Sequence, residues 1–245
     1  MPDIKIENLK VQFKNKKEIA VVIKELNLDI KSNTFNVIIG YSGCGKTTLL
    51  RTISGLEEYE GTILVDNKNI EEYDQRELNI SMIFQSISLF PHMTIFDNIA
   101  YPLKLLGIDK DEIKRRVTKI SEELNIRYLL TRKPKHLSMG QQQCVQIAKA
   151  MIKHPSIVLM DEPLSNVDSK SRSSLKQLIK KVVKDYNSTC LYVTHSLDEA
   201  MSLADNLILM NNGKIELTGA PLDVYNSNNE IIESLKEDHN LNSLS

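Results

Sequence analysis

The chain lacks long hydrophobic runs and closely spaced cysteines, and each absence excludes a class of protein. Its longest apolar runs, such as residues 157–160, fall far short of the roughly 20 residues that a membrane-spanning helix needs. The first residues show neither the basic start nor the apolar segment of a signal peptide. Cys44, Cys144 and Cys190 are too widely separated for a disulfide framework or a zinc-binding spacing. We therefore expect a cytosolic protein.

An excess of charge of one sign is also missing. The chain has 31 Lys and Arg against 32 Asp and Glu, so its formal net charge is -1. Proteins held on nucleic acid mainly by bulk positive charge carry a clear basic excess, and we expect no nucleic acid among the partners. What is present is 41% hydrophobic and 26% charged residues in a chain of 245, which is typical of a globular protein with a full core.

Glycine is scarce, yet three of the nine glycines cluster at Gly40, Gly43 and Gly45. The apolar run 35–39 predicts a buried parallel strand that leads into them. Residues 40–47 then fit the pattern G-x-x-x-x-G-K-S/T. Glycines permit positive φ and let backbone N–H groups surround phosphate oxygens, while the N-terminus of the following helix adds a partial positive charge.

This pattern predicts a phosphate-binding loop. Lys46 is expected to reach the β- and γ-phosphates, and the Thr47 hydroxyl to ligate Mg²⁺. The alternative is a glycine-rich turn with no ligand. The residues expected around the phosphates are Gly40, Tyr41, Ser42, Gly43, Cys44, Gly45, Lys46, Thr47 and Thr48.

Two acids follow a second buried-strand pattern. Residues 157–160 are apolar, and Asp161 and Glu162 come directly after them. Ligands of α/β sheets bind at the carboxyl ends of the strands, and successive strand residues point to opposite faces. We therefore predict that Asp161 acts on the Mg²⁺ side and that Glu162 activates the attacking water as general base. A polar turn at a strand end is the alternative.

Further motifs occur in a fixed order around these two. Gln85 follows the apolar strand 80–84, and Leu137-Ser138-Met139-Gly140-Gln141 precedes the acidic pair. Ser165-Asn166-Val167-Asp168 comes after that pair, and His195 follows the apolar run 191–194. Across residues 3–225, this order resembles the ATP-binding cassette (ABC) ATPases, whose Q-loop, signature, D-loop and switch histidine these motifs match.

The resemblance implies a fold and its domain organisation. The fold class is α/β, a P-loop NTPase (RecA-like) core with an antiparallel β layer and an inserted α-helical subdomain. Residues 1–88 would form the first part of the ATP-binding core and residues 89–153 the helical subdomain with the signature and a permease-facing surface. Residues 154–225 would complete the core, and residues 226–245 would form a polar tail.

The resemblance also implies roles for single residues. Catalytic roles fall to Glu162, His195, Lys46 and Gln85. The Mg²⁺ ligands would be Thr47, Gln85 and Asp161. Outside the phosphate loop, the ATP contacts would be Phe13, Ser138, Gly140, Gln141 and Asp168. Taken singly, Gln85 and His195 could be ordinary strand-end residues, and Phe13, near the family's adenine-stacking position, could be a core residue.

The signature has a physical interpretation of its own. Ser138 and Gln141 read as a capping box, so a helix is expected to begin there with its N–H groups facing outward as an anion site. In the family this site closes on the γ-phosphate held by a second subunit, so that ATP joins two cassettes. Four positions depart from the family pattern: Met139, Cys144, Lys149 and Asn166. None of them removes Lys46, Glu162 or His195, and hydrolysis is expected.

Local patterns predict three more features. Asp109 and Glu112 read as a second capping box, before a helix whose apolar face includes Ile113 and Val117. Asn212-Gly213 reads as a hairpin turn.

Residues 89–105 resemble the segment of importer-type cassettes that receives a permease helix, although ordinary packing would also explain their apolar residues. The resemblance therefore implies the ATP-hydrolysing subunit of an importer, peripheral on the cytoplasmic face of the cell membrane. Its partners would be a second ABC ATPase subunit in a homodimer or heterodimer, transmembrane permease subunits and an extracytoplasmic solute-binding protein. An exporter-type cassette and a catalytically weak ATP-binding partner in a heterodimer are the alternatives.

Overall fold

The computed structural model describes residues 2–14, 19–74 and 77–243, with side chains as far as residue 237. The chain divides into two compact units. Unit 1 comprises Met1–Leu78 and Thr189–Ser245, and unit 2 comprises Asn79–Ser188. In the described part of the chain, no helix is both long and apolar enough to cross a membrane. The domain boundaries expected from the sequence remain a prediction.

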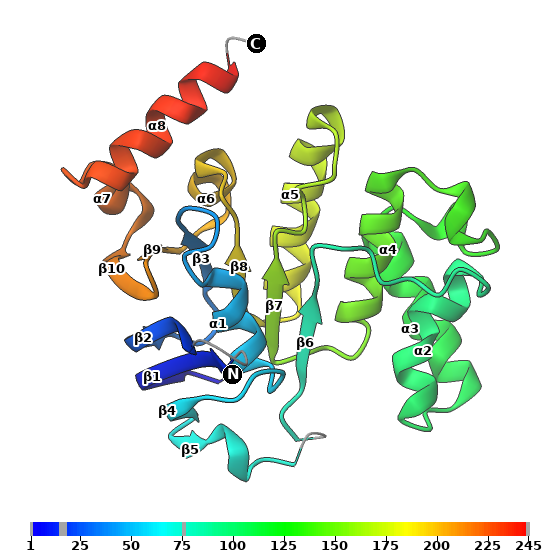
Figure 1. Ribbon diagram of the computed structural model, residues 1–245. Helices are drawn as coiled ribbons and strands as arrows, with labels where there is room; N and C mark the ends of the chain where they lie inside the picture. Colours follow the sequence, from blue (N-terminus) through cyan, green and yellow to red (C-terminus); the bar gives the residue numbers. More distant parts are fainter. Residues whose placement is uncertain (1, 15–18, 75–76, 244–245) are drawn as a thin grey trace. The chain divides into compact units, whose positions relative to one another are not determined.

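Unit 1 contains an antiparallel sheet in the order β2-β1-β4-β5 (Figure 1). Its strands are β1 (Ile4–Lys14), β2 (Ile19–Ile30), β4 (Glu60–Val65) and β5 (Lys68–Asn69). In β1 the side chains of Ile4, Ile6, Leu9 and Val11 are buried. The two-residue alternation breaks at Asn8, whose φ is 52°, because the register with β2 shifts between Ile6 and Leu9.

The second sheet of unit 1 carries the phosphate loop. β3 (Phe35–Ile39) lies between β8 (Thr189–Val193) and β9 (Asn206–Asn211) and runs parallel to both. Every residue of β3 and β8 is buried, which fits their mainly apolar sequences. Since β3 and β8 are parallel neighbours, the segments that follow them emerge at the same edge of the sheet.

Four α-helices and a hairpin complete the described part of unit 1. α1 (Lys46–Ile53) follows β3, and α6 (Leu197–Leu203) follows β8. The turn Asn212-Gly213 joins β9 to β10 (Lys214–Gly219) with φ values of 46° and 79°, which confirms the predicted hairpin. α7 (Pro221–Tyr225) and α8 (Glu230–Ser243) follow β10, and Ile232 and Leu235 of α8 are buried.

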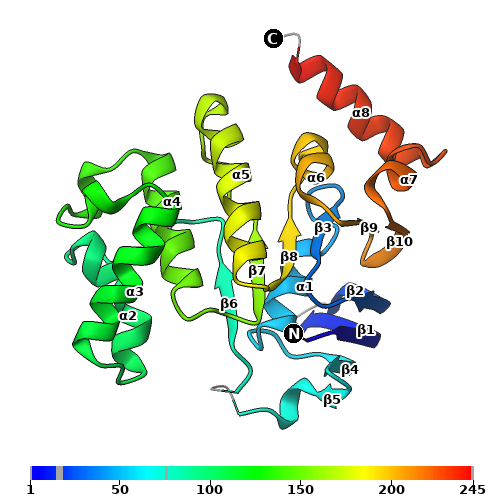
Figure 2. The same ribbon diagram turned by 180° about the vertical axis from the view of Figure 1, so that it is seen from behind.

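Unit 2 combines two parallel strands with four helices (Figure 2). β6 (Ile80–Ile83) pairs with β7 (Ile157–Asp161), and Ile83 lies opposite Met160 at their carboxyl ends. The helices are α2 (Ile95–Leu105), α3 (Lys110–Glu123), α4 (Met139–Met151) and α5 (Ser169–Asp185). Short 3-10 turns, η1 in unit 1 and η2 and η3 in unit 2, occupy Ile70–Glu72, Arg127–Leu129 and Pro134–His136.

The two predicted capping boxes differ in outcome. At Ser138 and Gln141 both reciprocal hydrogen bonds are present, so that prediction is confirmed. The prediction at Asp109 and Glu112 is wrong in its second half. Asp109 caps α3 by accepting from the N–H of Asp111, but the Glu112 carboxylate pairs with Arg115 and Arg116 instead of turning back to the cap. Two cations within one turn outcompete a single backbone N–H for the carboxylate.

Candidate functional site

Glycines shape the phosphate loop of unit 1 because backbone and side chains approach it closely. Gly40 has a φ of 154°, and a Cβ at this position would lie 2.1 Å from the Met210 carbonyl oxygen. Gly45 has a φ of 109°, and a Cβ there would lie 2.9 Å from Met210 Cε. Larger residues would therefore displace the loop from β9. The loop conformation follows from these contacts and from the positive φ of Gly43 and Gly45.

Lys46 turns its ammonium group into this loop. Its Nζ donates to the carbonyl oxygens of Gly40 at 2.8 Å and Tyr41 at 2.9 Å, and the side chain is buried. The helix that begins beside it has no side-chain cap, because its N-cap residue is Gly45. The start of α1 and the Lys46 ammonium thus belong to one loop. Both carry positive charge, and positive charge favours the binding of a phosphate group.

His195 lies at the same edge of this sheet as the phosphate loop. It follows β8 by two residues and is exposed. Its neighbour Thr194 bonds to a residue of α6, and its other neighbour, Ser196, is the N-cap of that helix. The Thr194 hydroxyl donates to Glu199 at 2.8 Å and accepts from the Ser196 N–H at 3.0 Å. The buried Glu199 carboxylate also accepts from the Tyr192 hydroxyl at 2.8 Å. This network fixes the backbone on both sides of His195.

In unit 2 the strand ends bring Gln85 and Glu162 together. Gln85 follows β6 and Glu162 follows β7, and the Gln85 Nε2 donates to Glu162 Oε2 at 3.3 Å. Asn166 of the D-loop donates its Nδ2 to the Gln85 carbonyl oxygen at 3.4 Å. Glu162 has a φ of 42°, and its carbonyl oxygen accepts from the Ser165 hydroxyl at 2.9 Å. The carboxylate is therefore presented from a tight turn at the end of the strand.

Asp161 is the last residue of β7 and is buried. Among the described residues, no group of three or more His, Cys, Asp and Glu side chains could hold a metal ion. Mg²⁺ is commonly bound by one or two protein oxygens together with water and substrate phosphates, so a cage of protein ligands is not required. In unit 2 the Asp161 carboxylate, at the end of β7, is an oxygen donor of this kind. In unit 1 the Thr47 hydroxyl, at the start of α1, is another.

The signature segment opens α4. The Ser138 hydroxyl accepts from the Gln141 N–H at 3.3 Å, and the Gln141 Oε1 accepts from the Ser138 N–H at 3.0 Å. A Cβ on Gly140 would make only ordinary contacts, the nearest being Ser171 Cβ at 3.6 Å. The fold therefore does not require glycine at this position. Met139, where the family usually has glycine, is 47% exposed.

Asp168 begins α5 as its N-cap. Its carboxylate accepts from the Ser171 N–H at 3.0 Å. The hydrogen bonds from the Ser171 backbone and hydroxyl hold the pKa of Asp168 below its usual value. The structure thus shows a capping role for Asp168, and its nucleotide contact stays a prediction.

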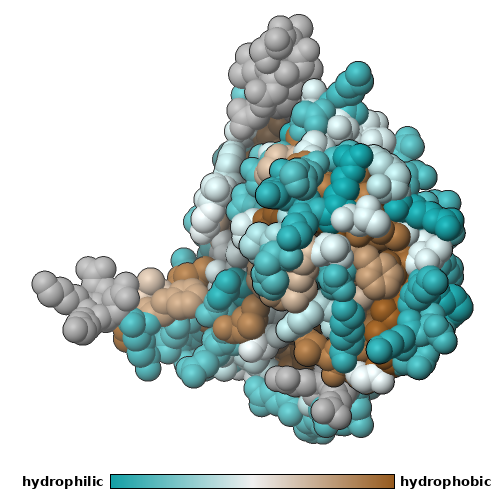
Figure 3. All heavy atoms as spheres, turned by 90° about the vertical axis from the view of Figure 1, so that its right-hand side faces the viewer, coloured by the Kyte–Doolittle hydropathy of each residue, from teal (hydrophilic) through white to brown (hydrophobic). Residues whose placement is uncertain are grey.

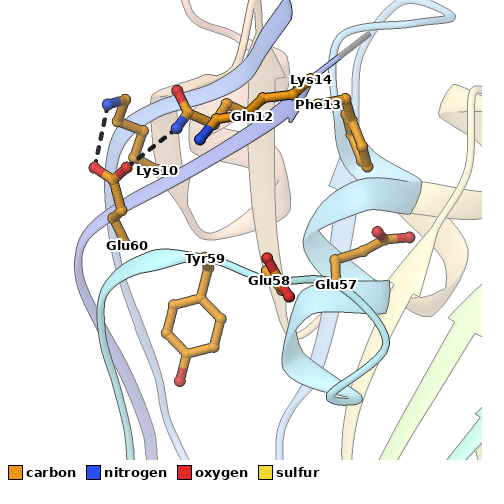
Figure 4. Close-up of a pocket in the computed structure, with 8 residues that line it drawn as sticks. All are labelled: Lys10, Gln12, Phe13, Lys14, Glu57, Glu58, Tyr59 and Glu60. Atoms are coloured by element: carbon orange, nitrogen blue, oxygen red, sulfur yellow. Dashed lines mark hydrogen bonds and ion pairs between the residues drawn. The ribbon is translucent and has the colours of Figure 1, made fainter. Parts of the chain in front are cut away.

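Phe13 borders a pocket of about 430 Å³ in unit 1 (Figure 4). Its side chain is 41% exposed, so the alternative that Phe13 is a core residue is wrong. Figure 4 shows the ring projecting from the end of β1 toward the segment that carries Glu57 and Glu58. On the far side of the pocket, Glu60 accepts hydrogen bonds from Lys10 and Gln12. An aromatic face is therefore available for stacking.

A groove of about 360 Å³ runs along unit 2 between β6, the end of α2 and α4. Leu105 and Leu106 on its wall are 70% and 52% exposed. Lys149 and Lys153 also line it, and burial lowers the pKa of both ammonium groups. Figure 3 shows apolar surface among polar side chains on the face that carries α2, α3 and α4. The segment 89–105, predicted from the sequence to face a permease, contributes Leu105 to this groove.

Sequence reasoning missed the residues that support these motifs. Glu199 carries a weak signal, because Ser196 and Glu199 have capping-box spacing, but here the carboxylate binds two hydroxyl groups instead. In the sequence Asn166 is only a departure from the family pattern, but in the structure it contacts Gln85. Nothing in the sequence around Gln146 indicates that its side chain bonds to the backbone of the Q-loop, as it does in the structure.

Comparisons with known proteins indicate a single family. A family model described as ABC transporter matches residues 23–165. The uncharacterized ABC transporter ATP-binding protein YurJ of Bacillus subtilis is 40% identical over 226 residues, covering 92% of this chain and 60% of the relative. The sn-glycerol-3-phosphate import ATP-binding protein UgpC 1 of Rhizobium johnstonii is 43% identical, covering 83% of this chain and 56% of the relative. This chain thus spans less than two thirds of either relative.

A solved structure extends the match to three dimensions. It is the ATP-binding cassette MJ0796, in a dimeric post-hydrolysis state bound to ADP and Pi, and its TM-score is 0.79 at 31% identity. The alignment covers 89% of this chain and 98% of that one. The α/β P-loop NTPase fold expected from the sequence is therefore confirmed. The family model spans more than half of the 245 residues, and the chain belongs to the ABC transporter family.

Proposed function

We propose that this chain is the ATP-hydrolysing subunit of an ABC importer. The observation that carries the hydrolytic part is the hydrogen bond between Gln85 and Glu162, which places an amide beside a carboxylate at two adjacent strand ends. The import function of UgpC 1 supports the direction of transport over an exporter-type cassette.

The proposed roles follow from the local chemistry. Lys46 and the uncapped start of α1 hold the ATP phosphates, and Phe13 stacks on the adenine. Glu162 accepts a proton from the attacking water, and His195 stabilises the charge that develops on the γ-phosphate. Thr47, Gln85 and Asp161 are the proposed Mg²⁺ ligands. When bound, Mg²⁺ neutralises phosphate charge in the transition state.

The second half of each ATP site comes from another cassette. The start of α4 presents Ser138, Gly140 and Gln141 with their backbone dipoles facing outward, an arrangement suited to a γ-phosphate. The related cassette MJ0796 is dimeric in a state bound to ADP and Pi, which supports such an assembly. We infer a dimer that ATP closes and hydrolysis reopens. Asp168 lies beside the same interface in this proposal.

Transport requires membrane partners. The groove beside Leu105 and Leu106 offers apolar surface to a helix of a permease, so the chain would be peripheral on the cytoplasmic face of the membrane. An extracytoplasmic solute-binding protein would deliver the solute. Copurification of the permease, followed by a screen for solutes that stimulate ATP hydrolysis, identifies the substrate.

Glu162→Gln tests the proposed base. The amide keeps the volume of the side chain but cannot accept the proton from water, so ATP turnover by the purified chain should fall by about 100-fold or more. Binding of a fluorescent ATP analogue should persist, because it depends on the phosphate loop. A variant that hydrolyses ATP as fast as the wild type shows that Glu162 is not the base. A wild-type chain that binds ATP without hydrolysing it supports the weak-partner alternative.

A further inference from the structure

The signature helix of unit 2 also holds the Q-loop. Gln146 lies on α4 and donates its side-chain amide to two backbone carbonyl oxygens, that of Phe84 at 3.0 Å and that of Ser86 at 3.4 Å. These carbonyls belong to the residues on either side of Gln85. A single amide group therefore brackets the glutamine that contacts Glu162.

A second residue of α4 anchors the same loop farther along. Lys149 Nζ donates to the Ser88 carbonyl oxygen at 2.8 Å and lies 4.4 Å from the centroid of the Phe90 ring. Gln146 and Lys149 are three residues apart and lie on one face of the helix. The loop is thus tied to α4 at three carbonyl groups.

Burial shows why Gln146 is informative. The residue is only 3% exposed, and its Oε1 has no hydrogen-bond partner within the described part of the chain. An apolar side chain of similar size would leave no buried oxygen unpaired. The two bonds donated to the Q-loop are the interactions that favour glutamine at this position.

The role inferred for Gln146 from these contacts rests on the proposed function. We propose that Gln146 is a positioning residue for ATP hydrolysis, which places Gln85 against Glu162 and ties that placement to the signature helix. Gln146 lies about 12 Å along α4 from Ser138, given a rise of 1.5 Å per residue. A shift of the signature when a second cassette binds would reach the Q-loop through this rigid helix.

The chain offers a matched control in Gln143. This glutamine lies on α4 one turn earlier and is 2% exposed, but its Nε2 has no hydrogen-bond partner among the described residues. Gln146→Met and Gln143→Met therefore make the same change of side chain at equal burial. Only the first removes hydrogen bonds to the Q-loop.

The experiment uses the full-length chain. Gln146→Met should lower kcat for ATP hydrolysis by about tenfold and leave the Kd of a fluorescent ATP analogue within about twofold, because misplacement of catalytic groups affects the reaction more than binding. Hydrogen exchange of the amides at 84–90 should become faster. Gln143→Met should match the wild type in all three measurements. Equal kcat and equal exchange for the two variants would overturn the proposal.

Gln146→Glu provides a second variant. Its carboxylate cannot donate to the two carbonyl oxygens, whereas the protonated form donates one bond. Turnover relative to the wild type should therefore rise as the pH is lowered, and a ratio that does not change with pH contradicts the positioning role. If the wild type neither binds nor hydrolyses ATP, the proposed function fails, but exchange at 84–90 still decides whether Gln146 holds the loop.

Discussion

Two helices of this chain begin at motifs expected to meet phosphate, and their first turns are built differently. α1 starts at Gly45 with no side-chain cap, and α4 starts at Ser138 with both bonds of a capping box. Before α1, glycine is required at Gly40 by the close Met210 carbonyl oxygen and at Gly43 and Gly45 by their positive φ, whereas at α4 Gly140 has room for a side chain. The first helix start is thus shaped by the backbone of a glycine-rich loop, and the second by hydrogen bonds from its own side chains.

The difference has a physical reason. The N-cap residue Gly45 has no side chain that could bond to the first N–H groups of α1. In α4 the side chains of Ser138 and Gln141 already satisfy two N–H groups, so the remaining donors and the helix dipole act on an approaching phosphate. We expect α1 to govern ATP affinity and α4 to govern turnover after dimerisation.

Among the variants that test this difference between α1 and α4, Lys46→Ala should have the largest effect on ATP binding and turnover. The ammonium group supplies the only side-chain charge in the loop 40–47, and its loss should reduce ATP binding and turnover by about 100-fold or more. Stability should change little, because the partners of Nζ among the described residues are two carbonyls of its own loop and Cys44. Lys214→Ala, at an exposed position of β10, is the control. Equal ATP affinity in the two variants would show that α1 does not hold the phosphates.

Alanine at the two glycines should separate fold from function. In Gly40→Ala the new Cβ meets the Met210 carbonyl oxygen, and we expect a loss of about 3 kcal/mol or more in the free energy of unfolding.

In Gly140→Ala the free energy of unfolding should rise by up to about 1 kcal/mol, because alanine favours a helix more than glycine. Its ATP turnover should nevertheless fall about tenfold, since the Cβ obstructs the phosphate. Urea unfolding measures the change in stability, and ATPase assays measure the change in turnover. Full activity in Gly140→Ala would show that the phosphate does not bind at the start of α4.

The smallest effect concerns Cys144, which lies inside α4. Burial raises the pKa of its thiol from 9.0 to about 11. The unfolded chain therefore loses this proton at lower pH than the folded one, and stability should fall as the pH rises from about 9 to about 11, by on the order of 2 kcal/mol. Comparing Tm at pH 8 and pH 10.5 for the wild type and Cys144→Ala tests this. A loss of equal size in both proteins would mean that Cys144 does not contribute.

Local sequence patterns predicted the elements that depend on nearby residues. The capping box at Ser138 and the hairpin at Asn212 each need contacts within a few positions, and both form. The glycine-rich loop 40–47 follows its strand and precedes its helix as expected, but its Gly40 also lies against Met210 of the distant strand β9. The second capping box failed because Arg115 and Arg116 compete for Glu112, a competition that the S/T/D-x-x-E pattern ignores. The exposure of Phe13 could not be read from alternation, because the shifts of register in β1 change which face each residue occupies.

The sequence by itself determined the order of the motifs, the buried strands that precede them and the residue types that can hold phosphate. Those properties can be read locally, since glycine conformation and helix capping depend on neighbours along the chain and an unbroken apolar run is typical of a buried strand. The tertiary structure decided which side chains support the motifs. Gln146 reaches Phe84 across 62 positions, and Gln85 reaches Glu162 across 77. A hydrogen bond requires donor and acceptor at about 3 Å, a condition that only the packing of distant segments can meet.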